Sequence, residues 1–249
     1  MYLTVQGLVL RVVNYNDTDA LLTVLTRQCG KLTVKARGLR RKNSPLIAPC
    51  QLLAYGEFTL FEYRGMYTIN EAHAIELFQQ LRNNLSGLSL GTYFAQVADV
   101  VSQQDAPDPE LLSLVLNCLY GLSKLCLPED QVKAVFEFRC ACLAGYMPDL
   151  SGCFQCGAAA PDRFDISQGV LECAACRNMN STGIRMPVTP GVLDAMRYIC
   201  SCDPRQLFNF SAGKKTLSEL AQISESYFTT QLERGFSALD FYKSLQNPV

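Results

Sequence analysis

The sequence predicts an α+β protein in which an N-terminal five-stranded barrel precedes an all-helical domain with a small inserted module. Three observations lead to this class. Apolar residues alternate with a period of two near the N-terminus, they recur every three or four residues afterwards, and two pairs of cysteines interrupt the helical part. We therefore expect one domain over residues 1–80 and a second over 81–249, with the module at about residues 147–187.

Five short strands are expected in the first domain. The third has the clearest pattern, because Leu32, Val34 and Ala36 alternate with polar residues and so face one side of a sheet. Turn clusters separate the strands, and a long loop follows the third one. The pattern fits a small closed barrel of the OB-fold type, and an SH3-like barrel fits it almost as well. The five segments are residues 8–13, 20–26, 31–37, 51–63 and 66–72.

Five helices are expected in the second domain. Asp108 and Pro109 form a start signal, in which an N-cap side chain precedes a proline at the first helical position. The segment from Thr216 to Glu219 has the spacing of a capping box, which predicts a helix running to about residue 245. The expected helices are residues 85–101, 108–126, 128–145, 191–200 and 216–245.

Basic side chains are concentrated near the N-terminus, although the formal net charge of the chain is only -1. Residues 1–82 hold ten Lys and Arg against six Asp and Glu, and residues 27–42 hold seven cations and no acidic residue. A local positive field of this kind attracts polyanions such as nucleic acids. A solvated surface with no ligand is an alternative of about equal weight.

Four cysteines in two pairs give the most specific chemical signal. Cys153 and Cys156, followed by Cys173 and Cys176, have the spacing C-x2-C-x16-C-x2-C, which is typical of a four-thiolate zinc site. One tight turn places each pair of sulfurs on one edge of a tetrahedron, and the intervening residues return the second pair to the first. We therefore predict one structural Zn²⁺. A redox pair and four unrelated buried thiols are the alternatives.

Motifs of known catalytic sites are missing from the sequence. The segment Gly213-Lys-Lys-Thr216 resembles the end of a phosphate-binding loop, but Phe208 stands where the loop requires glycine. The chain has one histidine, which weakens mechanisms that depend on a histidine base. We therefore expect that the protein is not an enzyme.

The apolar runs and the N-terminus favour a cytoplasmic protein with no membrane span. No apolar run approaches the roughly 20 residues that a bilayer requires, and the first residues lack the basic start and cleavage site of a signal peptide. In that compartment the 12 cysteines indicate metal binding or burial rather than a disulfide framework.

Two segments carry a resemblance to a known family. GLVLRVVNYNDTDALLTVLTRQCGKLTVKARGLRR resembles the opening of the bacterial RecO family of recombination mediators, and FEFRCACLAGYMPDLSGCFQCG resembles the passage of that family into its zinc module. The resemblance covers nearly the whole chain. It implies an OB-fold joined to a helical domain that bears a zinc element, although some members lack the four cysteines.

The resemblance also implies a function in DNA repair and recombination within the RecF pathway. Such a protein binds single- and double-stranded DNA, anneals complementary strands and works with RecR. It also contacts the acidic C-terminal tail of single-strand binding protein, so that it helps to load RecA. These roles imply a nucleoid-associated cytoplasmic protein.

A barrel with a cationic face can follow a phosphate backbone without reading its sequence. Four aromatic residues are candidate platforms for stacked bases, with burial in the core as the alternative for each: Tyr15, Tyr55, Phe58 and Tyr63. The candidate DNA-binding residues are Arg27, Lys31, Lys35, Arg37, Arg40, Arg41 and Lys42.

Two other classes of function fit the same sequence. The first is a zinc-ribbon adaptor between proteins, in which the basic strand is solvated and does not bind DNA. The second is a nucleic-acid enzyme with an unrecognised metal-dependent site. The adaptor predicts that Lys35 and Arg37 can be neutralised without loss of oligonucleotide binding, and the enzyme predicts turnover of DNA with magnesium.

Overall fold

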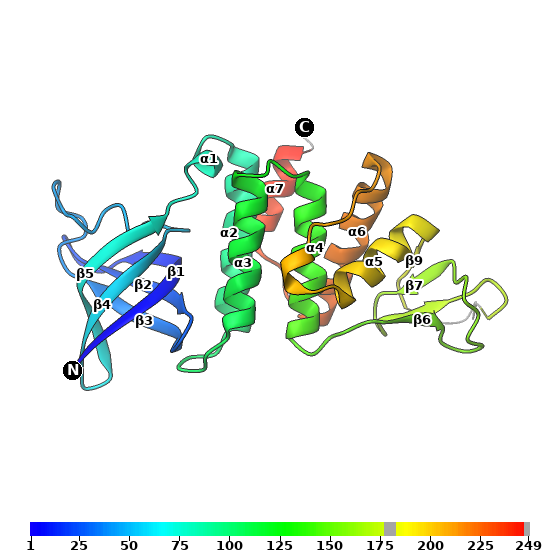
Figure 1. Ribbon diagram of the computed structural model, residues 1–249, viewed down its shortest axis with the longest axis horizontal. Coiled ribbons are helices and arrows are strands. Elements are labelled where there is room, and N and C mark those ends of the chain that lie inside the picture. The colour runs from blue at the N-terminus through cyan, green and yellow to red at the C-terminus, as the bar shows by residue number, and fades with distance from the viewer. Residues whose placement is uncertain (177–182, 247–249) are drawn as a thin grey trace. The chain divides into compact units, whose positions relative to one another are not determined.

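The computed structural model describes residues 1–176 and 183–246, and it confirms the α+β class (Figure 1). Five strands form a closed barrel in the order β1-β2-β3-β5-β4. All neighbouring strands are antiparallel except β3 and β5, which close the barrel as a parallel pair. This closure is that of an OB-fold rather than an SH3-like barrel. The strands are β1 (Tyr2–Asn14), β2 (Ala20–Thr26), β3 (Gly30–Ala36), β4 (Tyr55–Tyr63) and β5 (Met66–Glu76).

The barrel encloses the apolar residues that the alternating pattern predicts. Leu32, Val34 and Ala36 of β3 are buried in a core that also contains Phe58 of β4. The fourth strand begins at Tyr55 rather than at the expected residue 51 because residues 49–53 form turns. The long loop before β4 therefore extends from residue 37 to residue 54.

The barrel and four helices form one compact unit, which comprises Met1–Cys126 and the segment that begins at Phe236. Its helices are α1 (Gln79–Arg82), α2 (Leu85–Val101), α3 (Pro109–Ser123) and α7 (Ser237–Gln246). The N-cap prediction for α3 is confirmed, since Asp108 Oδ1 accepts a hydrogen bond from the Leu111 backbone N–H at 2.9 Å. The loop between α2 and α3 lies along β3, where the Lys31 N–H donates to Gln103 O.

The second compact unit comprises Leu127–Gly235. It contains the helices α4 (Glu129–Leu143), α5 (Pro190–Ser201) and α6 (Lys214–Gln231) and a short 3-10 helix at Pro204–Gln206. A small sheet of order β6-β8-β7-β9 forms the inserted module. Its strands are β6 (Asp149–Cys153), β7 (Arg163–Asp165), β8 (Val170–Glu172) and β9 (Arg185–Pro187).

The prediction of one helix over residues 216–245 is wrong. The chain forms α6 and α7 instead, and α6 begins at Lys214 with Gly213 as its N-cap, so that Thr216 lies inside the helix. The break between the helices contains Glu233 in the left-handed region, with φ at 50°. After this break the chain leaves the second unit and joins the first. Among the described helices, none is both long and apolar enough to span a bilayer.

Candidate metal centre and nucleic-acid interface

The two cysteine pairs converge in the module of the second unit. The sulfur atoms of Cys153, Cys156, Cys173 and Cys176 all lie within 4.8 Å of one another, and the Cys156 and Cys173 sulfurs are 3.7 Å apart. A tetrahedron with metal–sulfur bonds of about 2.3 Å has edges of about 3.8 Å. Four sulfurs at this spacing can therefore hold one metal ion.

Local backbone structure brings these sulfurs together. Cys153 ends β6 and Cys173 follows β8, and these two strands pair in parallel. Gly157 has a φ of 71° and donates its N–H to Cys153 O at 2.8 Å, which closes the turn that carries the first pair. Arg177, which follows the second pair, lies outside the described residues.

The cysteine sulfurs also differ in acidity. The Cys156 N–H donates to the Cys153 sulfur and lowers the pKa of Cys153 to about 6, which favours the thiolate that binds metals. The neighbouring Cys156 and Cys173 sulfurs raise the pKa of Cys176 to about 12. A bound cation would relieve this crowding of negative charge, because it favours deprotonation of every thiol that it ligates.

The seven predicted DNA-binding cations lie at two ends of β3. Arg27 belongs to the β2–β3 turn and Lys31 is the second residue of the strand, whereas Lys35 and the other four lie at its far end. The six-residue step from Gly30 to Ala36 corresponds to about 20 Å of extended chain. The structure therefore brings together five of the seven residues and separates Arg27 and Lys31 from them.

Lys31 is held within the protein rather than presented to solvent. Its side chain is 14% exposed, and its ammonium group contacts both the backbone oxygen and the carboxylate of Asp99 in α2. Arg11, which was not predicted to belong to the site, contacts the same carboxylate at 3.4 Å. Asp99 therefore compensates charge on this side of the barrel.

Lys35 is also paired. Its ammonium lies 3.1 Å from Asp19 Oδ2 and 4.8 Å from the centre of the Tyr15 ring. Asp19 also accepts the Gly38 N–H at 2.9 Å. This backbone donor, followed by Lys35, holds the pKa of Asp19 well below its usual range. Asp19 thus fixes the start of the loop that follows β3.

Four cations remain exposed in one short segment, residues 37–42, which we call the basic loop. Within the described part of the chain, none of them has an ion-pair partner. Arg40 donates from Nη1 to Asn16 O at 3.0 Å, which ties the loop to the β1–β2 turn. The exposed cations of the basic loop are Arg37, Arg40, Arg41 and Lys42.

The four candidate stacking residues have different environments. Phe58 is buried in the core, and Tyr55 is half-buried with its hydroxyl donating to Gln6 Oε1 at 3.3 Å. Tyr15 and Tyr63 are exposed, and the guanidinium of Arg64 lies 5.2 Å from the Tyr63 ring. Of the four, only Tyr15 and Tyr63 are exposed, and a cation lies over one face of each ring.

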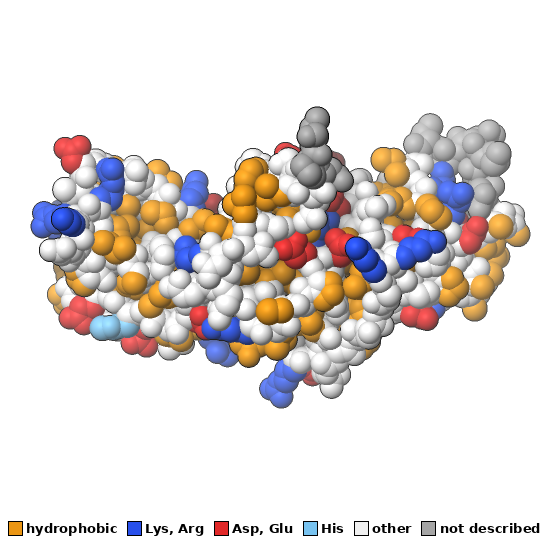
Figure 2. All heavy atoms as spheres, turned by 90° about the horizontal axis from the view of Figure 1, so that it is seen from above, with side chains coloured by type: hydrophobic (Ala, Val, Ile, Leu, Met, Phe, Trp, Pro, Cys, Tyr) orange, Lys and Arg blue, Asp and Glu red, His pale blue; other side chains and the backbone are white. Residues whose placement is uncertain are grey.

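Sequence reasoning missed an exposed aromatic pair on the same barrel. The rings of Tyr2 and Phe61 lie 5.3 Å apart on neighbouring strands. Phe61 is paired with Thr68, which is paired with Lys35, so these side chains share the outer face of the barrel. Figure 2 shows Lys and Arg side chains interspersed with hydrophobic ones over the barrel surface, at the left of the view.

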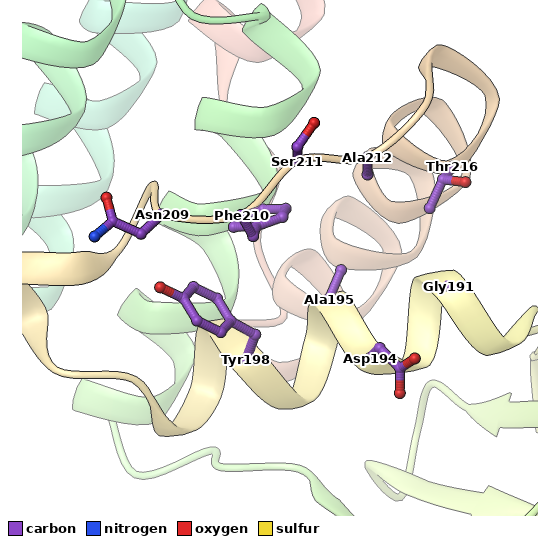
Figure 3. Close-up of a pocket in the computed structure, with 9 residues that line it drawn as sticks. All are labelled: Gly191, Asp194, Ala195, Tyr198, Asn209, Phe210, Ser211, Ala212 and Thr216. Carbon is purple, nitrogen blue, oxygen red and sulfur yellow. The ribbon is translucent and has the colours of Figure 1, made fainter.

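The second unit has a shallow pocket of about 420 Å³ between α5 and the segment before α6 (Figure 3). The rings of Tyr198 and Phe210 line it with their centres 5.4 Å apart, and Asp194 lies one turn before Tyr198. The pocket can accept an apolar side chain of a peptide.

Comparison with known proteins identifies relatives along the whole chain. The family model described as "Recombination protein O N terminal" matches residues 1–78, and the model described as "Recombination protein O C terminal" matches residues 82–240. The "DNA repair protein RecO" of Acetivibrio thermocellus is 34% identical over 98% of this chain and 97% of its own length. The protein of the same name from Alkaliphilus metalliredigens is 27% identical over 98% of this chain and 100% of its own length. The one from Bacillus subtilis is 27% identical over 90% of this chain and 87% of its own length.

Proposed function

Because the chain belongs to the RecO family of DNA repair proteins, we propose that it binds single- and double-stranded DNA and anneals complementary strands. With RecR, it would help to load RecA onto DNA coated by single-strand binding protein. The observation that carries this proposal is the basic loop. It presents four exposed cations that form no ion pair with any residue that the structure describes, and it lies beside an outer barrel face with exposed aromatic rings.

The proposed DNA path follows the basic loop and the adjoining barrel face. Phosphates would contact the guanidinium and ammonium groups, whose counterion release makes binding depend on salt. Bases would stack on exposed rings such as Tyr15 and Tyr63. Lys31 and Lys35 would contribute less than the basic loop, because each already neutralises a carboxylate. Arg27 would contact only DNA that extends to the other end of β3.

Annealing by this path requires no active site. Two complementary strands repel each other through their phosphates, and a cationic surface that binds both lowers this repulsion. We therefore propose a binding protein and not an enzyme, which acts in the cytoplasm at the nucleoid.

For the metal centre we propose one Zn²⁺ held by Cys153, Cys156, Cys173 and Cys176. Four thiolates leave no open coordination position, so the ion would stabilise the module and take no part in chemistry. Its role is expected to be structural because the strands of the module are three to five residues long.

Partner binding is proposed for the second unit. The pocket beside Tyr198 and Phe210 would take the apolar part of the acidic tail of single-strand binding protein. Lys214 and Lys215 are exposed at the start of α6, next to the pocket residues, and would attract the acidic part. Asp194 would repel it, so the acidic part is expected to run on the α6 side.

Annealing of complementary oligonucleotides tests the proposal and separates its two surfaces. We expect that the variant Arg37→Ala/Arg40→Ala/Arg41→Ala loses annealing of naked strands, whereas Lys214→Ala/Lys215→Ala retains it. On strands coated with single-strand binding protein, both variants should anneal more slowly than the wild-type protein. Full annealing of naked strands by the first variant, with an unchanged circular dichroism spectrum, would remove the basic loop from the DNA path.

The zinc-ribbon adaptor remains a second candidate, because two of the seven predicted cations serve internal ion pairs. It predicts that the wild-type protein does not bind oligonucleotides at physiological salt while it still binds its protein partners. Measuring both kinds of binding on one preparation distinguishes it from the DNA mediator.

A further inference from the structure

A second group of cysteines lies in the second unit, away from the metal centre in the sequence. Cys142 is in the last turn of α4 and Cys200 is near the end of α5, and their thiols are within hydrogen-bonding reach of each other. Cys142 is half-buried and Cys200 is only 7% exposed. Cys142 is therefore more accessible to an oxidant than Cys200.

Arg139 fixes the geometry of this group. It lies one turn before Cys142 on α4, and its Nη1 donates to the backbone oxygens of Cys200 and Cys202 at 3.2 and 3.4 Å. The guanidinium therefore ties the two helix ends together beside the thiols. The Cys200 thiol and then the Arg139 charge lower the pKa of Cys142, and Cys142 raises the pKa of Cys200. These directions agree with the exposure of the two residues, since the more exposed Cys142 is the thiol that is more accessible to an oxidant.

We propose that Cys142 and Cys200 form a dithiol site that hydroperoxides oxidise to a disulfide between α4 and α5. With hydrogen peroxide, the Cys142 thiol first releases its proton to solvent, and the thiolate attacks one oxygen. A sulfur–oxygen bond forms, the oxygen–oxygen bond breaks, and the departing hydroxide takes up a proton from solvent to become water. The Cys200 sulfur then attacks this sulfenic acid, the disulfide forms, and the oxygen leaves as a second water with the Cys200 proton. Two electrons pass from the two sulfurs to the peroxide.

The position of the pair gives the disulfide a structural consequence. The metal module lies between Cys142 and Cys200 in the sequence, so the disulfide closes a loop of roughly 60 residues around it. Tyr227 of α6 lies close to both thiols and contacts Phe164 of the module with ring centres 5.3 Å apart. The oxidised chain would therefore keep the ends of the module joined when the metal is lost.

Three other cysteines outside the metal centre have different surroundings. Cys126 is exposed in the first unit, and Cys50 is buried in the barrel core, where burial raises its pKa to about 12. Cys202 is the nearest competitor for Cys200, since it is two residues away and half-buried, but its sulfur is directed to Ile199 O at 3.8 Å.

Peptide mapping of the full-length, metal-loaded protein tests the proposal. The protein is treated with a few equivalents of hydrogen peroxide, alkylated in denaturant and digested with trypsin. We expect a linked pair of the peptides 140–163 and 198–205, with fragmentation assigning the bond to Cys142 and Cys200. The linked pair should disappear in Cys142→Ser and persist in the controls Cys126→Ser and Cys202→Ser.

A thermal measurement gives an independent readout. After metal removal with a chelator, the oxidised wild-type protein should unfold at a temperature roughly 5–15 °C higher than the reduced protein. Dithiothreitol should abolish the difference, and Cys142→Ser should not show it. The absence of the linked peptides in oxidised wild-type protein, their persistence in Cys142→Ser, or equal melting temperatures with and without oxidation would overturn the proposal.

Discussion

Gly30 offers a sharp test of how the barrel is joined to its helices. It has a φ of 66°, and a Cβ atom added there would lie 2.1 Å from Ala106 O in the loop between α2 and α3. That loop is held to β3 by hydrogen bonds from the Lys31 N–H to Gln103 O and from the Asp105 N–H to Lys31 O. The colliding atoms are backbone atoms, so they cannot move without breaking these bonds.

The expected cost of Gly30→Ala has two parts. A left-handed conformation costs an alanine about 1–2 kcal/mol, and overlap in a packed region adds about 1–3 kcal/mol. Gly65 is the matched control, because its φ is 75° and no atom lies within 4 Å of an added Cβ. Gly65→Ala should therefore show only the conformational cost.

Urea unfolding of the two variants separates these costs. Circular dichroism follows the transition, because the chain has no tryptophan. We expect Gly30→Ala to lower the free energy of unfolding by about 1–3 kcal/mol more than Gly65→Ala. Equal losses in the two variants would refute the close approach of the α2–α3 loop to β3.

Three further predictions concern the metal, an acidic residue and a buried ion pair. Wild-type protein should contain about one zinc per chain by elemental analysis, and Cys153→Ser should lose it; unaltered zinc in that variant would contradict the assignment. Because the fold holds the pKa of Asp19 below its ordinary value of 3.8, the ionised carboxylate stabilises the fold at pH values above 3.8. This contribution is lost as the pH falls from 3.8 toward the lower pKa of the folded state. Unfolding of Asp19→Asn should therefore depend less on pH in this range, and an unchanged profile would count against the role of Asp19. Lys133 is buried and contacts Glu137 and Glu225 at 3.2 and 2.9 Å, so Lys133→Met should lose about 3–5 kcal/mol in denaturant unfolding; a loss below 1 kcal/mol would exclude an essential ion pair.

The barrel could be predicted from the sequence because its signal is local. Alternation in β3 records which side chains enter the core, and the core contains the residues that the alternation selects. The break between α6 and α7 could not be predicted in the same way. Glu233 adopts a positive φ where glycine is preferred, and no proline marks the end of the helix. The break arises because the chain passes to another compact unit, which is a property of the tertiary structure.

The candidate sites show the same difference between local and distant signals. The cysteine spacing predicts the sulfur cluster because each pair lies in one turn. For Lys31 and Lys35, alternation correctly predicts that the side chain points out of the barrel core. It does not predict that a carboxylate lies within ion-pair distance of each ammonium group. The partner of Lys31 is Asp99, which is 68 residues away, so its position depends on how α2 packs. The exposed pair of Tyr2 and Phe61 likewise depends on the register of β1 and β4.

Salt dependence of single-stranded DNA binding tests the central claim most directly. If the four cations of the basic loop each neutralise a phosphate, the logarithm of the binding constant should fall with the logarithm of salt concentration at a slope of about -3. Replacing Arg37, Arg40, Arg41 and Lys42 with alanine should reduce that slope to near zero, whereas Lys214→Ala/Lys215→Ala should leave it unchanged. If the variant with all four residues replaced keeps both the salt-dependence slope and the DNA affinity of the wild-type protein, the account is contradicted.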